Sequence, residues 1–475
     1  MDIFDDAPPT GHQPSDHQPT GQSARELPCL LKLPSEILHE ILSYLCAQDL
    51  SRVSMTSRTL AEHAGNDRLW AGLVNSHLPF PIPDSGPFAS FRRLYLAHAP
   101  YWFIPQYKIW FADNEHTGNI VVARYDNRRG VIEAYRLVSD RGGQVQFLDW
   151  QTNPNVMVQS FDPTVALWMD DPVLLLKDPE PSRPIAPIQS CSEERRMPLA
   201  AESQHVFSSI LLCSNQRDGN RTVAPIKLWP PVTIPSSNRV PRDVTPTRLL
   251  QPDKSSEVSH TAFRLRRWVN FRPLLSPGNN EQLLTYATLD PSLYTPTKEK
   301  PYQGIWVGDY SAHGSEFLLF LQQDTPALDR QPDSSSSSEG EVKSESEVNG
   351  DSAAAGIIQQ GSLTAIKLTG DPNVPRGEIS FTAADIGPNG LVSVASGEPF
   401  KGARIVRCSG QVAGLGFRDG TLSDIHLLLV KLTANLYLFI LSCLDQLSAH
   451  SHVPRLRCPL LGGDGPRLLF PSGGY

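Results

Sequence analysis

The segment LPSEILHEILSYL, from Leu33 to Leu45, has the pattern of a short amphipathic helix near the start of the chain. Pro34 suits the first turn of a helix, where its missing N–H costs no hydrogen bond. The large apolar residues of the segment recur at helical spacing and define one face, formed by Ile37, Leu38, Ile41, Leu42 and Leu45. Further short helical patterns continue to about residue 77, with Ser57 as a candidate N-cap.

A helical block of fewer than fifty residues buries too little surface to be stable alone. A partner protein that covers the apolar face would supply the missing burial. The alternative is a small helical domain that buries this face against its own chain. The segment is too short and too charged to cross a membrane.

The composition argues against several classes of protein. The formal net charge of −8 over 475 residues disfavours nucleic acid as the main partner, because phosphate binding requires a basic surface. No run of about 18 apolar residues predicts a transmembrane span, and the acidic, proline-rich start lacks the pattern of a signal peptide. The 7 cysteines are scattered without a C-x-x-C pair, so we expect neither a zinc site nor a disulfide framework, and a cytoplasmic or nuclear location.

The remainder of the chain has the alternation and turn signals of β-strands. Residues 101–138 are aromatic and β-branched, and the turn signals DNEHTGN and DNRRG divide them into three strands in two hairpins. Strand patterns return at 302–323 and again from residue 361. The acidic, serine-rich segment 333–351 therefore lies within a β-domain as an insertion.

We expect an α+β fold, in which a small helical block is followed by a large, antiparallel, barrel-like β-domain. The predicted boundaries are a disordered tail at 1–27, the helical block at 28–78, a connector and helix at 79–100, and the β-domain at 101–475, with disordered insertions at about 178–204, 215–258 and 324–357.

The helical block resembles the F-box family. The features that carry the resemblance occur in order: LPSEILHEILSYL, then QDLSRVSMTSRTL, then NDRLW. The match covers roughly residues 31–76 and departs in SMTSRTLAEH, which lacks the Cys and Trp that the family often has. The resemblance implies docking to a Skp-type adaptor on a cullin scaffold, by helix-in-groove contacts. The implied adaptor-binding residues are Leu33, Pro34, Ile37, Leu38, Ile41 and Leu45.

Three later segments resemble F-box only protein 31 and its relatives, namely GIWVGDYSAHGSEFLLF (304–320), LTGDPNVPRGEISF (368–381) and GQVAGLGFRDG (410–420). The insertions between them look fungal. This resemblance implies a barrel-like domain that binds the tail of a protein substrate, including C-terminal degrons. The residues themselves suit a sheet, because Ile305 and Val307 fall on one face of a strand and Trp306 and Gly308 on the other.

Five residues of these segments are candidates for contact with a substrate, namely Tyr310, His313, Glu316, Asp371 and Asn373. In GDPNVPRG, Asp371 can accept hydrogen bonds from backbone amides in a turn, or its carboxylate can face a cavity and accept from a peptide terminus. A plain tight turn explains the motif equally well. The simpler interpretation of His313 is a loop residue, and that of Glu316 is a solvated strand residue.

Two other clusters have structural interpretations. The aromatic residues between 101 and 111 are best explained by core packing, although aromatic side chains also anchor peptides. The basic patch RLRRW (264–268) is too short to outweigh the acidic total, and we interpret it as a solvated strand face.

No motif predicts catalysis, a metal site or a cofactor. The sequence has no G-x-S-x-G, G-x-x-x-x-G-K-[ST], H-E-x-x-H or EF-hand loop. The predicted function is substrate recognition for an SCF-type ubiquitin ligase, with a Skp-type adaptor, a cullin scaffold and a protein substrate as partners. The alternatives are a barrel that binds a small apolar ligand, an F-box protein that acts outside ubiquitination and, last, a hydrolase.

Overall fold

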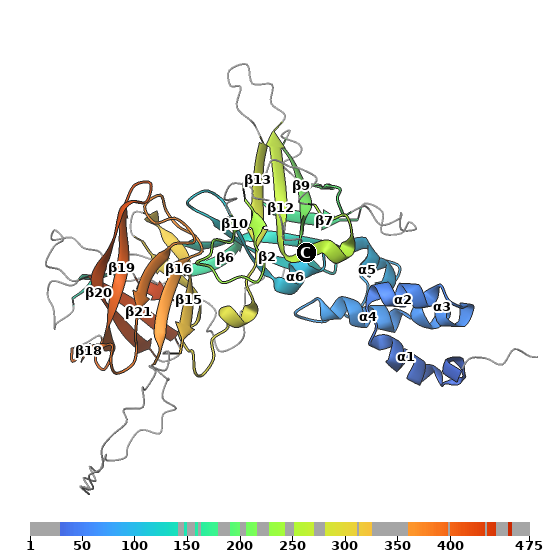
Figure 1. Ribbon diagram of the computed structural model, residues 1–475, viewed down its shortest axis with the longest axis horizontal. Helices are drawn as coiled ribbons and strands as arrows, with labels where there is room; N and C mark the ends of the chain where they lie inside the picture. The colour runs from blue at the N-terminus through green and yellow to red at the C-terminus, as the bar shows by residue number, and fades with distance from the viewer. Residues whose placement is uncertain are drawn as a thin grey trace, which may run out of the picture. The chain divides into compact units, whose positions relative to one another are not determined.

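The chain divides into two compact units, Met1–Leu73 and Val74–Tyr475, in a computed structural model (Figure 1). The structure describes residues 29–140, 147–149, 157–159, 163–178, 191–199, 206–215, 228–242, 251–269, 281–310, 313–324, 360–397, 400–432, 435–442 and 455–457.

The first unit is helical. Its elements are the 3-10 helix η1 (Cys29–Lys32) and the helices α1 (Ser35–Ser43), α2 (Ala47–Ser54), α3 (Arg58–Ala64) and the start of α4 (Asp67–Ser76). Leu38 and Leu42 of α1, Leu50 of α2 and Trp70 of α4 are buried. Ser57 is the N-cap of α3, where its side chain accepts a hydrogen bond from the Leu60 N–H, as the sequence predicts.

The second unit contains two large antiparallel sheets and a few short helices. The helical elements are α5 (Phe91–His98), α6 (Phe103–Tyr107), η4 (Ser255–Glu257) and η5 (Pro291–Leu293). Two short ribbons accompany the sheets and are formed by β4 (Phe147–Asp149) with β5 (Met157–Gln159) and β10 (Leu228–Trp229) with β11 (Val240–Pro241).

The first sheet has nine strands among the described residues, in the order β6-β3-β2-β1-β13-β12-β9-β8 with β7 paired to β3. The strands are β1 (Ile109–Ala112), β2 (Asn119–Asp126), β3 (Val131–Asp140), β6 (Thr164–Trp168), β7 (Leu174–Lys177), β8 (Arg195–Met197), β9 (Val206–Ser214), β12 (Val258–Val269) and β13 (Glu281–Ala287). The two hairpins predicted within 101–138 are confirmed as β1-β2-β3. The first of these strands begins only at Ile109, because residues 103–107 form α6.

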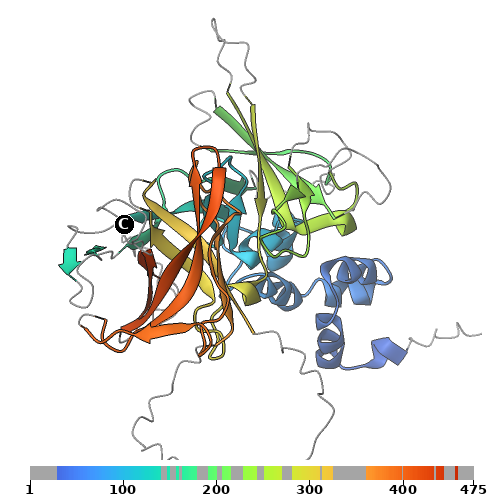
Figure 2. The same cartoon turned by 60° about the vertical axis from the view of Figure 1, so that its left-hand side comes forward.

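The second sheet closes on itself. Its strands are β14 (Gly304–Asp309), β15 (Ser315–Gln323), β16 (Ser362–Lys367), β17 (Ile379–Ala383), β18 (Leu391–Val394), β19 (Arg404–Gly414), β20 (Arg418–Leu432), β21 (Asn435–Ser442) and β22 (Arg455–Arg457). They follow the order β17-β16-β15-β14-β22-β21-β20-β19-β18, and the additional pairing of β17 with β19 joins the two sides of the sheet (Figure 2, yellow to red). The predicted α+β fold, with an antiparallel barrel-like domain after the helices, is confirmed.

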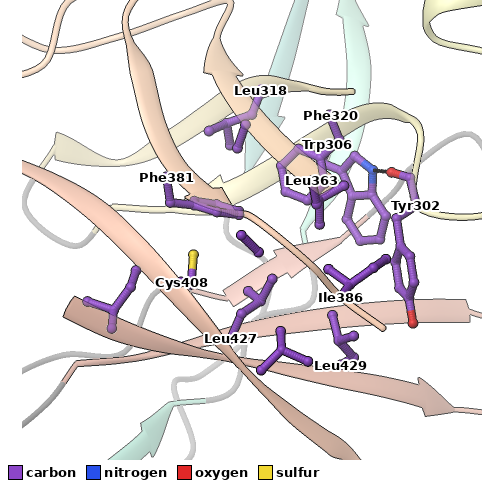
Figure 3. Packing of buried hydrophobic residues seen from close by; sticks show 14 residues of the cluster. Tyr302, Trp306, Leu318, Phe320, Leu363, Phe381, Ile386, Cys408, Leu427 and Leu429 are labelled. Carbon is purple, nitrogen blue, oxygen red and sulfur yellow. Dashed lines mark hydrogen bonds between the residues drawn. The ribbon is translucent and has the colours of Figure 1, made fainter. Parts of the chain in front are cut away.

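Strand β14 is buried on both faces and separates two cores. Trp306 points into the closed sheet, where it stacks on Phe320 with ring centroids 4.9 Å apart (Figure 3). Ile305 and Val307 belong to a second cluster, which also contains Phe111 of the first sheet. The alternation predicted for GIWVGDY is therefore confirmed, and each face of the strand stabilises a different core.

Parts of two predicted insertions are ordered. The segment predicted at 178–204 contributes β8 to the first sheet, and the segment at 215–258 contains β10, β11 and η4. The reason is that both segments contain apolar side chains that are buried, including those of Met197, Trp229 and Ile234. The predicted tail at 1–27 and the segment 325–357 lie outside the described residues.

The basic patch RLRRW is not a solvated strand face. It lies in β12, near the middle of the first sheet, where Arg264 is buried and Arg266 and Arg267 are half-buried. Arg264 donates to the Pro241 carbonyl, and Arg266 forms an ion pair with Glu194 at 2.5 Å. The prediction failed because total charge gives no information about which face of a strand a sheet covers.

Candidate functional site

Helix α1 presents a row of apolar side chains that the other described residues of the helical unit leave uncovered. Leu33 just before the helix is 37% exposed, and Ile37 and Ile41 are 49% and 42% exposed. Ile37 and Ile41 are four residues apart and therefore lie one above the other on the helix surface. We call these three residues the α1 row.

The sequence pattern of α1 divides into two neighbouring stripes. Leu38 and Leu42 point into the helical unit and are buried, whereas Pro34 is exposed and Leu45 is half-buried. Of the six residues predicted to contact an adaptor, Leu38 is thus buried within the unit and does not form part of its surface. The buried stripe fixes the helix in place, and the α1 row remains free for another protein.

The second sheet contains a cluster of buried charges. The Lys367 Nζ at the end of β16 lies 2.7 Å from the Asp371 Oδ2 and 2.7 Å from the Glu316 Oε2. All three side chains are almost completely enclosed, with Lys367 only 1% exposed. The Lys367 Nζ also lies 4.2 Å from the centroid of the Tyr310 ring, which supplies a cation–π contact. The described residues thus place Glu316, Lys367, Asp371 and Tyr310 in one group, the charged cluster.

Asp371 organises the turn GDPNVPRG that follows β16. Its Oδ1 accepts hydrogen bonds from the backbone N–H groups of Asn373 and Val374, at 2.6 and 2.9 Å. Burial alone would raise the pKa of this carboxyl, but hydrogen bonds from Glu316, Lys367 and Val374 lower it to about 2. The Asx-turn predicted for Asp371 is confirmed, and its carboxylate is fully engaged by these donors.

Glu316 has the opposite electrostatic environment. Burial raises its pKa to about 8, with the Lys367 charge acting in the other direction and the neighbouring Asp371 adding to the rise. At neutral pH Glu316 is therefore mostly protonated, and Lys367 and Asp371 carry the one positive and the one negative charge of the cluster. The interpretation of Glu316 as a solvated strand residue is wrong, because its side chain is enclosed.

The same turn connects the second sheet to the first. The Gly370 N–H donates to the Thr117 carbonyl at 2.9 Å, and the Arg376 N–H donates to the His116 carbonyl at 2.9 Å. A Cβ on Gly370 would lie 2.5 Å from the Arg376 nitrogen, so only glycine permits this close approach. The Arg376 guanidinium lies over the Trp229 ring, 4.1 Å from its centroid. The turn therefore holds the two sheets together.

The remaining predicted substrate residues, Tyr310, Asn373 and His313, each have different hydrogen-bond partners. The Tyr310 hydroxyl bonds to the Ser380 Oγ at 2.7 Å, and the Asn373 side chain donates to the Ala413 carbonyl at 3.0 Å. His313 is exposed next to the cluster, where its N–H donates to the Tyr310 carbonyl. The structure thus brings Tyr310, Glu316 and Asp371 together, while the side chains of Asn373 and His313 are not members of the cluster.

Two residues of this site were not predicted. Lys367 ends an apolar strand pattern in SLTAIK, four residues before Asp371, and Arg376 ends the turn. A lysine within an otherwise buried strand is a signal that it has an enclosed partner. The arrangement can hold a proton on Glu316 and fix a turn, and the described residues include no group of three or more His, Cys, Asp or Glu placed to hold a metal. None of the described helices is long and apolar enough to span a membrane.

Comparison with protein families gives two matches that agree with these two regions. Residues 30–76 match the F-box-like family, and residues 286–453 match the Cyclin D1 binding domain family. The first match covers η1 to α4, including the α1 row, and the second covers β14 to β21 and the charged cluster. The helical block is therefore an F-box-like domain, as its sequence indicates. The comparison with curated proteins gives no match, so the resemblance to F-box only protein 31 and the fungal origin stay predictions.

Proposed function

We propose that this chain is the substrate-recognition subunit of an SCF-type ubiquitin ligase. The single observation that carries the proposal is that the F-box-like segment, residues 30–76, leaves the α1 row exposed. An apolar row on a folded helix is a surface that a groove on another protein can cover. In this proposal the groove belongs to a Skp-type adaptor, which links the chain to a cullin scaffold in the cytoplasm or nucleus.

The role of the second unit is to bind the protein that is to be ubiquitinated. This part of the proposal is supported by the match of residues 286–453 to the Cyclin D1 binding domain family, which makes a D-type cyclin the first target to test. The chain would contribute proximity and orientation, because it holds the target near a ubiquitin-loaded enzyme. It carries out no chemical step itself.

The predicted substrate-contacting residues differ in how accessible their side chains are to a ligand. Asp371 and Asn373 are engaged within the turn, so we propose that they act on substrate by shaping its surface. His313 is exposed and is the member of the set that a ligand can reach directly. The rival hypothesis of a small apolar ligand inside the closed sheet is not favoured, because Trp306, Phe320, Phe381 and their neighbours fill that interior.

Affinity purification of the full chain, with and without a proteasome inhibitor, tests the proposal. We expect the adaptor and the cullin to co-purify under both conditions, and the target to accumulate only with the inhibitor. Adaptor without cullin would favour a role outside ubiquitination, and absence of both would refute the assignment. Purified D-type cyclin, added to the purified chain with its adaptor, then tests the proposed target directly.

A further inference from the structure

The first sheet encloses a pocket that the proposed adaptor contact does not use. Its volume is about 340 Å³, and β2, β3, β8, β9, β12 and β13 contribute to its lining. Ligand pockets in proteins usually measure about 300–1,000 Å³, so this one has room for one or two side chains. Leu265 and Leu284 form an apolar part of the wall, and Tyr286 is almost completely buried.

The pocket contains more positive than negative charge. Arg136, Arg266 and Arg267 line it, and the acidic residue in the lining is Asp171, which is exposed. Arg266 is neutralised by Glu194 at 2.5 Å, and Glu194 is itself held by the Ser209 hydroxyl at 2.7 Å. No ion pair or hydrogen bond joins the Arg136 or Arg267 side chain to another of the described residues. Two guanidinium groups without an ion-pair partner among the described residues therefore line one cavity.

The cross-strand neighbours of these two arginines do not neutralise them. Arg267 pairs with Ser208 on β9 and Gln282 on β13, which are uncharged. Arg136 pairs with Val121 on β2 and Trp168 on β6, which are also uncharged. Like charges in a confined space repel one another, and an anion between them removes this repulsion.

Further polar groups line the same cavity. Burial raises the pKa of Tyr286, while the charges of Arg267 and Arg136 act in the opposite direction, so both guanidinium groups bear on this residue. Its hydroxyl makes no hydrogen bond to the described residues. The Asn114 Oδ1 is buried and has no hydrogen-bond partner within the described part of the chain. The cavity thus combines two guanidinium groups and a hydroxyl, which can donate to a ligand, with the Asn114 amide oxygen, which can only accept.

We propose that this pocket binds an oxyanion of a peptide, either a side-chain carboxylate or a phosphate, with Arg136 and Arg267 as its ligands. The planar guanidinium fork matches both groups, and Leu265 and Leu284 accommodate apolar side chains next to the acidic one. The peptide would belong to the protein target, so in this respect the inference rests on the proposed function. The anion site itself does not depend on adaptor binding.

Titration of the full chain with inorganic phosphate and, separately, with glutarate tests the pocket, at constant ionic strength and with calorimetric detection. The variants are Arg136→Gln, Arg267→Gln and Arg267→Lys. The matched control is Arg128→Gln, which removes an exposed arginine from the β2–β3 turn. We expect wild type and the control to bind at least one anion with equal affinity. Each Gln variant should bind at least tenfold more weakly, and Arg267→Lys, which keeps the charge without the fork, should fall between them.

The unliganded variants provide the folding control. Because removal of one arginine relieves repulsion, the Tm of Arg136→Gln and Arg267→Gln without anion should equal or exceed that of wild type. Binding of glutarate would identify a carboxylate, and binding of phosphate alone a phosphorylated side chain. Equal affinity in all five proteins, no binding by wild type, or equal loss in the Arg128 control would overturn the proposal. Adaptor co-purification, measured on the same variants, should stay unchanged, so failure of the pocket is distinguishable from failure of the proposed function.

Discussion

The F-box-like helices and the closed second sheet distribute their side chains in opposite ways. Helix α1 leaves Ile37 and Ile41 in solvent, whereas the sheet encloses Lys367 and Asp371. Burial of an exposed apolar row lowers the free energy only when another molecule covers the row. A buried ion pair is already compensated within the chain, and it fixes local geometry. The comparison separates an apolar surface that another molecule would stabilise by covering it from a charged cluster that the sheet already encloses.

The strongest test of this comparison is a charge on the α1 row. Ile37→Glu together with Ile41→Glu should raise the Kd for the adaptor at least 100-fold, because burial of each side chain contributes about 1.5–3 kcal/mol. Calorimetry with purified adaptor measures this, and circular dichroism should show unchanged helix content. The matched control is Val412→Glu with Leu422→Glu, which alters two exposed apolar residues of the second sheet. Undiminished adaptor binding by the α1 double variant would contradict the comparison.

The second test removes the two acids of the charged cluster one at a time. Asp371→Asn should lower the free energy of unfolding by about 3–5 kcal/mol, since it leaves Lys367 buried without its ionised partner. Glu316→Gln should change it by less than about 1 kcal/mol at pH 4.5, because the native carboxyl is protonated there and the unfolded chain has only begun to lose this proton. Denaturant unfolding measures both values. Equal losses in the two variants would show that the acids have equivalent roles.

The pH dependence of Glu316 follows from its raised pKa. The folded state holds the proton up to about pH 8, whereas the unfolded state loses it near the ordinary glutamate pKa of 4.5. Wild type therefore loses stability relative to Glu316→Gln as the pH rises from 4.5 towards 8. A constant difference between the two proteins across this range would show that Glu316 is ionised in the folded chain.

A smaller effect is expected from His98 of α5. Burial lowers its pKa from 6.5 to about 3, and its Nε2 donates to the Gly130 carbonyl at 3.1 Å. The folded state thus excludes a proton that the unfolded state binds, so stability falls as the pH drops below 6.5. Between pH 6.5 and 5 the loss should be about 2 kcal/mol. Unfolding titrations of wild type and His98→Gln should differ in this slope, and identical slopes would refute the assignment.

The smallest effect concerns the N-cap of α3. Ser57→Ala removes the acceptor of the Leu60 N–H and should destabilise the helix by about 1 kcal/mol. Hydrogen exchange at the α3 amides of the full chain measures this change. Ser57→Asp, which keeps an acceptor, should restore protection. If exchange is unaffected in Ser57→Ala, the helical unit is held by packing alone.

The helices were predictable because their information is local. The spacing of Ile37, Leu38, Ile41 and Leu42 defines a helix face, and Ser57 marks a helix start. The same spacing did not show that Leu38 and Leu42 turn inwards while their neighbours face solvent. That division depends on contacts with α3, which no period within α1 specifies.

The charged cluster was only half predictable, because its members come from different strands. The turn chemistry of Asp371 could be recognised locally, whereas its partner Glu316 lies 55 residues earlier on β15. Lys367 was overlooked because its neighbours indicate only an apolar strand. RLRRW failed for a related reason, since alternation separates the two faces of β12 without showing which of them a sheet encloses.

The position of β14 has a consequence for how the protein can be divided. The segment 286–453 that matches a domain family is not a self-contained body, because Ile305 and Val307 share a buried cluster with Phe111 and Ile120, which precede the segment by more than 160 residues. A fragment cut at the family boundary would expose the face of β14 that carries Ile305 and Val307 to water, and it should aggregate. A recombinant form of the second unit therefore has to start before β1, so that it contains the residues that pack on both faces of β14.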